Sequence, residues 1–165
     1  MNIVLIGNMG AGKTSAGRVL ARRLGRVFID MDEYIELKEG KSVGQLFEPG
    51  EENFRRAEAR AAEDISRLES CVVATGGGVV KNAANMQKLS RSGIIVYIKR
   101  PPELVLASAD MRGRPLLRDK PERLYEIMAE RAPLYEKYAD FIIKSTGTIE
   151  EAAEKIYQKI QELKI

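Results

Sequence analysis

The chain has 165 residues, of which 44% are hydrophobic and 31% are charged, and its formal net charge at pH 7 is +3. A chain of this length is most simply one domain with a substantial core, so we expect a single domain over residues 1–165. One cysteine and no histidine exclude an intramolecular disulfide, histidine-dependent triads and nearly every common transition-metal site. Any catalysis therefore uses carboxylates, lysine, arginine, hydroxyls and backbone groups.

Charge patterning and hydropathy limit the partners and the location of the protein. The basic residues are dispersed rather than gathered in a tract, which argues against nucleic-acid binding. No apolar run approaches the roughly 20 residues of a transmembrane helix, and the N-terminal "MNIVLIGNMG" lacks the basic region of a signal peptide. We expect a soluble, cytoplasmic protein without a membrane partner, and phosphorylated small molecules suit its mildly basic balance.

Five short apolar runs predict β-strands. They cover residues 2–7, 26–30, 71–75, 93–99 and 140–144. Each run is continuous and rich in Val and Ile, as expected for strands that are covered on both faces. Cys71 lies inside the third run, where it is expected to be a small buried core residue.

Amphipathic segments between these runs predict helices. Apolar residues recur three and four positions apart at Phe54, Ala57, Ala61, Ile65 and Leu68, and again over residues 149–163. Thr148 and Glu151 have the spacing of a capping box at the start of the last helix. The alternation of strands and helices predicts an α/β fold with a parallel sheet and right-handed crossovers.

The first strand leads into "GNMGAGKT", residues 7–14, which matches the phosphate-loop pattern in its required position between a strand and a helix. Glycines allow backbone N–H groups to converge on phosphates, Lys13 supplies positive charge, and the Thr14 hydroxyl is a candidate Mg²⁺ ligand. The alternative is a simple glycine turn before a helix. The predicted nucleotide-binding residues are Gly10, Ala11, Gly12, Lys13, Thr14 and Ser15.

Two classes of nucleotide-binding protein fit the sequence poorly. The chain has no Asn-Lys-x-Asp guanine signature, and "DMRG" at residues 110–113 follows a helical pattern instead of a strand. Motor and transporter ATPases usually need larger or multiple domains. A compact kinase that acts on a small acceptor remains.

Six motifs, "GNMGAGKT", "FIDMDEYIE", "GEENFRRAE", "ATGGG", "RGRPLL" and "ERAPLY", together resemble the shikimate kinases, within the nucleoside-monophosphate-kinase-like group. The resemblance implies a three-layer sandwich with a five-stranded parallel sheet of the phosphate-loop kinase type. It also implies a substrate-binding region at about residues 32–60 and a small lid at about residues 112–120. The implied reaction is the transfer of phosphate from ATP, with Mg²⁺, to the 3-hydroxyl of shikimate on the route to chorismate and aromatic amino acids.

The resemblance also implies an acceptor site. It assigns Arg55 and Arg131 to the substrate carboxylate, which suits the planar, bidentate donors of arginine, and Glu58 to the support of Arg55. Gly76, Gly77 and Gly78 are expected to bring backbone close to the substrate. For each arginine the alternative is a solvated surface residue, and for the glycines a plain tight turn. Pro133 is expected to interrupt or kink its helix.

Arg114 resembles the lid arginine that closes on the transferring phosphates. The chain departs from many relatives at Ala107, where an arginine often stacks on adenine, so its adenine contacts are in question. The segment "KSTGT", residues 144–148, is expected to approach the base or the ribose.

The two aspartates of "FIDMDEYIE" are predicted to have different tasks. Residues two apart at a strand end face the same side, so both can point into the nucleotide cleft. By resemblance, Asp30 holds Mg²⁺ together with Thr14, and Asp32 binds the acceptor hydroxyl and takes its proton. The alternative for Asp32 is a helix N-cap.

Two other functions compete with this interpretation. A kinase of another small metabolite, such as a gluconate kinase-like enzyme, would also bind a carboxylate-bearing acceptor. A nucleotide-binding regulator that no longer catalyses would keep the phosphate loop alone, whereas Lys13, Thr14, Asp30 and Arg114 are all present. Similarity to the family further favours a monomer.

Overall fold

The protein is built around a parallel sheet, seen here in a computed structural model that describes residues 1–107 and 120–164. Within these residues the sheet has five strands in the order β2-β3-β1-β4-β5. The strands are β1 (Asn2–Ile6), β2 (Val27–Asp30), β3 (Cys71–Ala74), β4 (Gly93–Lys99) and β5 (Phe141–Lys144). All four pairings are parallel, which confirms the predicted sheet.

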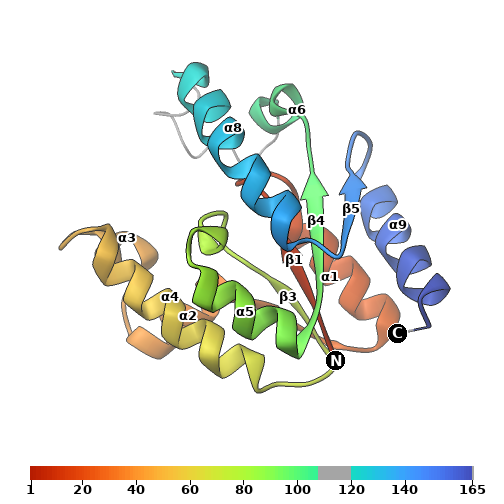
Figure 1. Ribbon diagram of the computed structural model, residues 1–165, viewed down its shortest axis with the longest axis horizontal. Coiled ribbons are helices and arrows are strands. Elements are labelled where there is room, and N and C mark those ends of the chain that lie inside the picture. The colour runs from red at the N-terminus through yellow and green to blue at the C-terminus, as the bar shows by residue number, and fades with distance from the viewer. Residues whose placement is uncertain (108–119, 165) are drawn as a thin grey trace.

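Helices cover both faces of the sheet, which makes the fold a three-layer α/β sandwich (Figure 1). Helices α1 (Lys13–Leu24) and α9 (Ile149–Glu162) pack on one face. The opposite face carries α2 (Met31–Glu39), α3 (Val43–Phe47), α4 (Glu51–Ser66), the 3-10 turn η1 (Val79–Lys81), α5 (Ala83–Ser92) and α8 (Pro121–Tyr138). The short α6 (Pro102–Leu106) follows β4 and contacts α8.

The apolar runs of the central strands feed two cores. In β1, Ile3 and Leu5 enter the core under α1 and α9, while Val4 and Ile6 enter the core on the opposite face. Because successive side chains of a strand point to opposite faces, a strand covered on both faces must be apolar throughout. This explains why the sequence shows continuous runs instead of alternation.

The expectation that every strand is covered on both faces is wrong for β2 and β5. Val27 is 66% exposed and Ile142 is 42% exposed. Both strands lie at the edges of the sheet, where helices cover them only in part. Apolar character alone does not distinguish an edge strand from a central one.

The predicted helix patterns hold except at their last positions. Phe54, Ala57, Ala61 and Ile65 of α4 are buried, but Leu68 lies beyond the end of the helix and is 40% exposed. Leu163 likewise follows α9 and is 47% exposed. A helix that ends a few residues earlier no longer turns the next apolar side chain towards the core.

Two local predictions are confirmed and one is not. The capping box forms, since Thr148 Oγ1 accepts the Glu151 N–H and Glu151 Oε2 accepts the Thr148 N–H, each at 3.2 Å. Cys71 is buried. Helix α8 continues through Pro133 to Tyr138, so the proline does not interrupt it, and the alternative of a kink stays a prediction. The buried Leu124 packs with Val105 of α6, and the buried Tyr135 lies in the core on the α4 face of the sheet.

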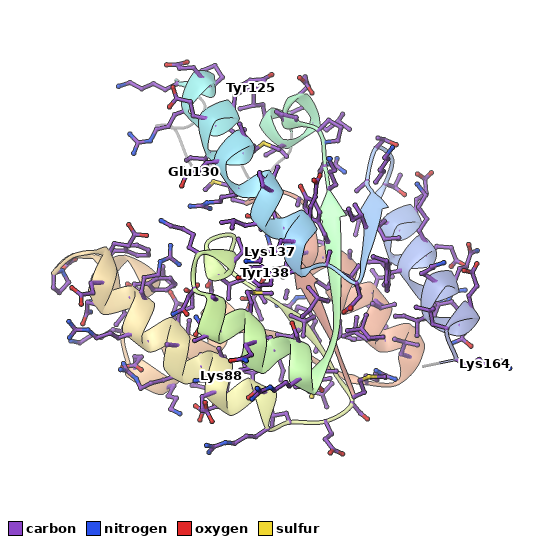
Figure 2. All side chains as sticks on the ribbon, viewed as in Figure 1. Lys88, Tyr125, Glu130, Lys137, Tyr138 and Lys164 are labelled. Carbon is purple, nitrogen blue, oxygen red and sulfur yellow. The ribbon has the colours of Figure 1, made fainter. Side chains whose placement is uncertain are left out.

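Charged side chains project from the helices at the surface (Figure 2). Lys88 of α5, for example, pairs with Glu63 of α4 at 2.7 Å. In residues 1–107 and 120–164, no helix combines the length and the hydrophobicity needed to cross a membrane.

Candidate active site

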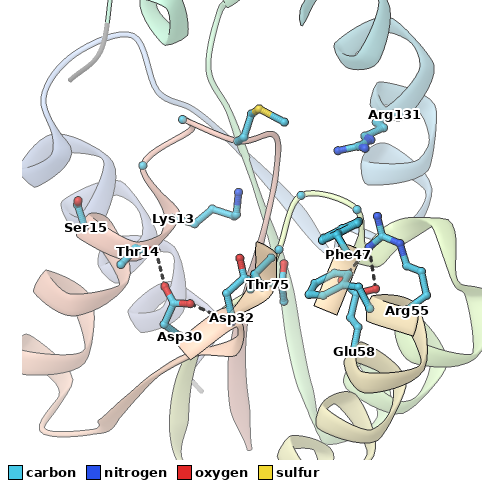
Figure 3. Close-up of a pocket in the computed structure, with 18 residues that line it drawn as sticks. Lys13, Thr14, Ser15, Asp30, Asp32, Phe47, Arg55, Glu58, Thr75 and Arg131 are labelled. Atoms are coloured by element: carbon cyan, nitrogen blue, oxygen red, sulfur yellow. Dashed lines mark hydrogen bonds and ion pairs between the residues drawn. The ribbon is translucent and has the colours of Figure 1, made fainter. Parts of the chain in front are cut away.

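A cavity of about 510 Å³ opens beyond the carboxyl ends of β1, β2 and β3 (Figure 3). Ligands of open parallel sheets gather at this edge. The predicted site residues that line it are Gly10, Gly12, Lys13, Thr14, Ser15, Asp30, Asp32, Arg55, Glu58, Gly76, Gly77, Gly78 and Arg131. Ala11 belongs to the same loop, but its side chain is buried in the core under α1 and α9.

The phosphate loop depends on glycine at two crowded positions. Gly7 has φ +147°, and a Cβ there would lie 2.6 Å from the carbonyl oxygen of Ile98. Gly12 has φ +89°, and its Cβ would lie 2.7 Å from Ile149 Cδ1. Gly12 is also the N-cap of α1 and gives it no side-chain cap, so an anion in the cavity can satisfy the first-turn N–H groups of this helix.

Lys13 folds back over the phosphate loop. Its Nζ donates to the carbonyl oxygens of Gly7 and Asn8, each at 2.7 Å, and the residue is only 8% exposed. The loop carbonyls thus hold a buried cation at the wall of the cavity, where phosphate oxygens can become its partners.

Asp30 connects the phosphate loop to α2. Thr14 Oγ1 donates to Asp30 Oδ2 at 2.7 Å. Asp30 Oδ1 accepts the backbone N–H groups of Asp32 at 3.0 Å and Glu33 at 3.3 Å. Asp30 is therefore the N-cap of α2, and the alternative that Asp32 caps this helix is wrong.

Asp32 is the second residue of α2, so it does not share an extended strand end with Asp30 as the sequence suggested. The strand stops at Asp30 because that side chain starts the helix. Both acids nevertheless line the same cavity, Asp30 beside Thr14 and Asp32 nearer its centre (Figure 3). A Cβ on Gly76 would lie 3.1 Å from Asp32 Oδ1, so only a glycine leaves ordinary room beside this carboxylate.

Arg55 is held by acids on both sides along α4. Its Nη1 donates to both carboxylate oxygens of Glu58, at 3.1 and 3.0 Å, while Nε and Nη2 donate to Glu51 Oε1 at 3.1 and 3.0 Å. Burial by itself lowers the pKa of Arg55, but the pair with Glu58 and the bonds to Glu51 raise it overall. The guanidinium is therefore fixed in orientation and charged at every accessible pH.

Glu58 is the buried member of this pair, with 1% of its side chain exposed. Burial raises the pKa of the Glu58 carboxyl above its ordinary value, the Arg55 guanidinium partly offsets this, and the Asp32 carboxylate raises it further. Glu58 thus takes part in the electrostatics of both the arginine and the aspartate of the cavity.

The second arginine, Arg131, comes from α8 and lies on the same side of the cavity as Arg55, away from Thr14 and Ser15 (Figure 3). A Cβ on Gly77 would lie 3.4 Å from Arg131 Nη1, and a Cβ on Gly78 would lie 2.4 Å from Arg55 Nη2. The two guanidiniums therefore approach the same glycine loop. A side chain at position 78 would therefore have to displace the Arg55 guanidinium from its place between Glu51 and Glu58.

Sequence reasoning missed several residues that line the cavity or support its lining. Glu51 lies four residues before Arg55, a helical spacing that could have identified it. Phe47 and Phe54 stack at the cavity wall with ring centroids 4.5 Å apart, a contact between separate helices that no local pattern reveals. Tyr135, four residues after Arg131, was not singled out either.

The predictions for the lid, for Ala107 and for residues 144–148 are not tested by the geometry of this cavity. Arg114 and all of the proposed lid except Lys120 lie outside the described residues. Ala107 ends α6 and is exposed. The approach of residues 144–148 to the base stays a prediction.

Comparisons with a family model, with known sequences and with solved structures all point to the same family. A family model described as shikimate kinase matches residues 9–161. The shikimate kinase of Caldanaerobacter subterraneus is 44% identical, over 99% of this chain and 98% of its own length. One from Clostridium botulinum is 40% identical, over 93% of each chain. The solved structure of the Acinetobacter baumannii shikimate kinase in complex with shikimate superposes with a TM-score of 0.91 at 38% identity, covering 99% of this chain and 94% of that one.

Proposed function

The chain belongs to the shikimate kinase family, and we propose that it transfers the γ-phosphoryl group of ATP to the 3-hydroxyl of shikimate. The product, shikimate 3-phosphate, lies on the route to chorismate and the aromatic amino acids. One observation carries the proposal: a single cavity holds the phosphate loop on one side and two arginines on the other, with Asp32 between them.

The phosphate loop forms the ATP side of the site. Backbone N–H groups of residues 10–15 at the start of α1 receive the β and γ phosphates, and Lys13 exchanges its carbonyl partners for phosphate oxygens. Charge-assisted bonds to phosphate are stronger than bonds to neutral carbonyls. The lysine is therefore expected to keep its bonds to the phosphoryl oxygens in the transition state.

The arginines form the shikimate side. Arg55 and Arg131 bind the substrate carboxylate, and Gly76, Gly77 and Gly78 let the ring approach the backbone. Glu58 keeps the Arg55 guanidinium in place through two hydrogen bonds. Because Glu51 holds the remaining edge of Arg55, the substrate carboxylate either displaces Glu51 there or binds beside it.

Asp32 acts at the reacting hydroxyl. The 3-oxygen of shikimate forms a bond to the γ-phosphorus while the bond from that phosphorus to the β–γ bridging oxygen breaks, and ADP leaves with the electron pair. Asp32 accepts the hydroxyl proton, a role that its place near the centre of the cavity supports. No covalent enzyme intermediate is needed, because in-line transfer depends on alignment and charge neutralisation.

Thr14 and Asp30 suit a magnesium site. Their hydroxyl and carboxylate oxygens are 2.7 Å apart, and Mg²⁺ prefers oxygen ligands with several waters retained. We assign Thr14 as a direct ligand and Asp30 as an acid that acts through water. Bound Mg²⁺ supplies positive charge to the β and γ phosphate oxygens.

Location and assembly are also part of the proposal. Use of ATP and of a biosynthetic intermediate favours the cytoplasm. Similarity to the family favours a monomer, and light scattering coupled to gel filtration would test this.

Release of ADP with different acceptors tests the proposed function. We expect rapid ADP formation with shikimate, and rates at least about a hundredfold lower with gluconate and quinate, because a rigid cavity discriminates by contacts in the transition state. Gluconate turnover above that with shikimate would favour the gluconate kinase-like alternative. ATP binding without turnover of any acceptor would favour the regulator.

A further inference from the structure

Helix α8 carries a second polar residue beside the cavity, one turn after Arg131. Residues four apart lie on the same helix face, so Tyr135 follows Arg131 towards the loops at the end of the sheet. Tyr135 is fully buried, and its ring stacks on Tyr97 of β4 with centroids 4.9 Å apart. The ring is part of the core, whereas the hydroxyl reaches the loops beside the cavity.

The hydroxyl of Tyr135 contacts both the glycine loop and the phosphate loop. It donates to the carbonyl oxygen of Gly77 at 2.5 Å, and Asn8 Oδ1 of the phosphate loop lies 3.3 Å away. A tyrosine hydroxyl has a single proton, so the short bond to Gly77 is the stronger of the two. One side chain thus connects the phosphate loop with the glycine loop of the acceptor side.

The two loops also touch directly at this point. A Cβ on Gly77 would lie 3.3 Å from the backbone nitrogen of Met9 and 3.5 Å from the carbonyl oxygen of Gly7. The glycine loop therefore rests on the phosphate loop, and the Tyr135 hydroxyl fastens it there. A shift of this carbonyl would change the separation between the two substrates.

The hydroxyl is a permanent donor. Burial raises the pKa of Tyr135 far above its ordinary value, and the charge of the Arg131 guanidinium and its hydrogen bond to the hydroxyl lower it only in part. A buried hydroxyl without a partner is costly, so the fold favours the loop position that keeps the bond to Gly77.

We propose that Tyr135 is a positioning residue, whose hydroxyl fixes the glycine loop against the phosphate loop and so aligns shikimate with the γ-phosphoryl group. The inference rests on the proposed function, which it extends by naming what joins the donor and acceptor sides. Small misplacements of reacting groups have large effects on rate. The hydroxyl should therefore matter more for the rate of transfer than for the binding of either substrate alone.

The test compares Tyr135→Phe with Tyr97→Phe. Both variants keep the stacked rings and remove one hydroxyl. Tyr97 lines a neighbouring apolar cavity together with Asn8, and among the described residues no hydrogen bond joins its hydroxyl to either loop. We expect Tyr135→Phe to lower kcat about tenfold, with each KM within about threefold of wild type. Tyr97→Phe is expected to keep wild-type kcat.

A second readout excludes a purely structural effect. Calorimetric titration of shikimate with and without ADP measures how strongly the two sites are coupled. We expect Tyr135→Phe to lose most of this coupling while its Tm stays within a few degrees of wild type. Asn8→Ala breaks the weaker contact and should lower kcat only about twofold to threefold.

Three results would overturn the inference. Wild-type kcat and coupling in Tyr135→Phe would show that the hydroxyl does not align the substrates. An equal loss in Tyr97→Phe would assign the effect to the aromatic stack. Absence of shikimate turnover in the wild-type enzyme would remove the proposed function and the inference with it, whereas normal wild-type turnover with an unaffected variant removes the inference alone.

Discussion

The two sides of the cavity are built in different ways. The proposed ATP side is one contiguous loop, residues 7–15, whose backbone and helix N-terminus would provide most of the binding groups. The proposed shikimate side consists of side chains from α2, α4 and α8 and the glycine loop after β3. The first can be recognised from local sequence, whereas the second exists only after the sheet has brought distant segments together. Mutations on the two sides should therefore change different kinetic parameters.

Asp32 stands where the two sides meet and should give the largest effect. We expect Asp32→Asn to lower kcat about a thousandfold, since general base catalysis contributes roughly 100-fold to 10,000-fold. Helix α2 should survive because Asp30 provides its cap. Steady-state kinetics and ADP binding by calorimetry would measure both effects.

Asp30→Asn is the matched control for Asp32→Asn. Asparagine is also a good N-cap, so α2 should again be preserved. The expected change is a higher Mg²⁺ concentration for half-maximal activity. If Asp32→Asn turned over at near-normal rate, or Asp30→Asn left the magnesium titration unchanged, the assigned division of tasks would be wrong.

Lys13→Met tests the ATP side. Removal of one preorganised charge from a transition state costs about 100-fold to 1,000-fold in kcat. Because Lys13 Nζ donates to the Gly7 and Asn8 carbonyls of the phosphate loop and its proposed partner is ATP, shikimate affinity should change little. A variant with kcat within tenfold of wild type would contradict the role of this lysine.

Lysine replacements of the two arginines test the shikimate side. Arg55→Lys and Arg131→Lys should each raise KM for shikimate about tenfold to a hundredfold, because a planar pair of donors to a carboxylate is lost. KM for ATP should stay within about twofold. Arg56→Lys, an exposed arginine of the same helix paired with Glu52, is the matched control and should behave as wild type.

The smallest expected effect is a pH dependence from Glu58. Burial raises its pKa above the ordinary value of 4.5, so the folded state binds the proton more tightly than the unfolded state. The stability that this provides is present below pH 4.5 and is lost as pH rises through the raised pKa. The free energy of unfolding of wild type minus that of Glu58→Gln should therefore decrease as pH rises through this window in urea denaturation. A difference that grows with pH would reverse the assigned direction.

The phosphate loop could be identified from local sequence alone, whereas the acceptor side could not, for physical reasons. A phosphate loop is a local backbone structure, so its residues and their order determine its shape. The acceptor residues were identified through their resemblance to family motifs, since neither Arg55 nor Arg131 differs from a surface arginine in local pattern. The partial exposure of the edge strands β2 and β5 was missed because a single apolar run does not reveal the order of the strands in the sheet.

Details set by packing were also missed. The sequence interpretation considered only Asp32 as an alternative N-cap and overlooked Asp30, although Asp30 and Glu33 have the spacing of a capping box. The hydroxyl of Tyr135 connects loops far apart in the chain, and only the folded protein reveals such a contact. Arg114 stays a prediction of the sequence.

Proton–phosphorus correlation NMR of the reaction product tests the central claim most directly. Wild-type enzyme with ATP, Mg²⁺ and shikimate should yield one new phosphate ester whose phosphorus couples to the proton on carbon 3 of the ring. Phosphorylation of another hydroxyl, or release of inorganic phosphate without an ester, would contradict the proposed alignment of ATP, Asp32 and shikimate.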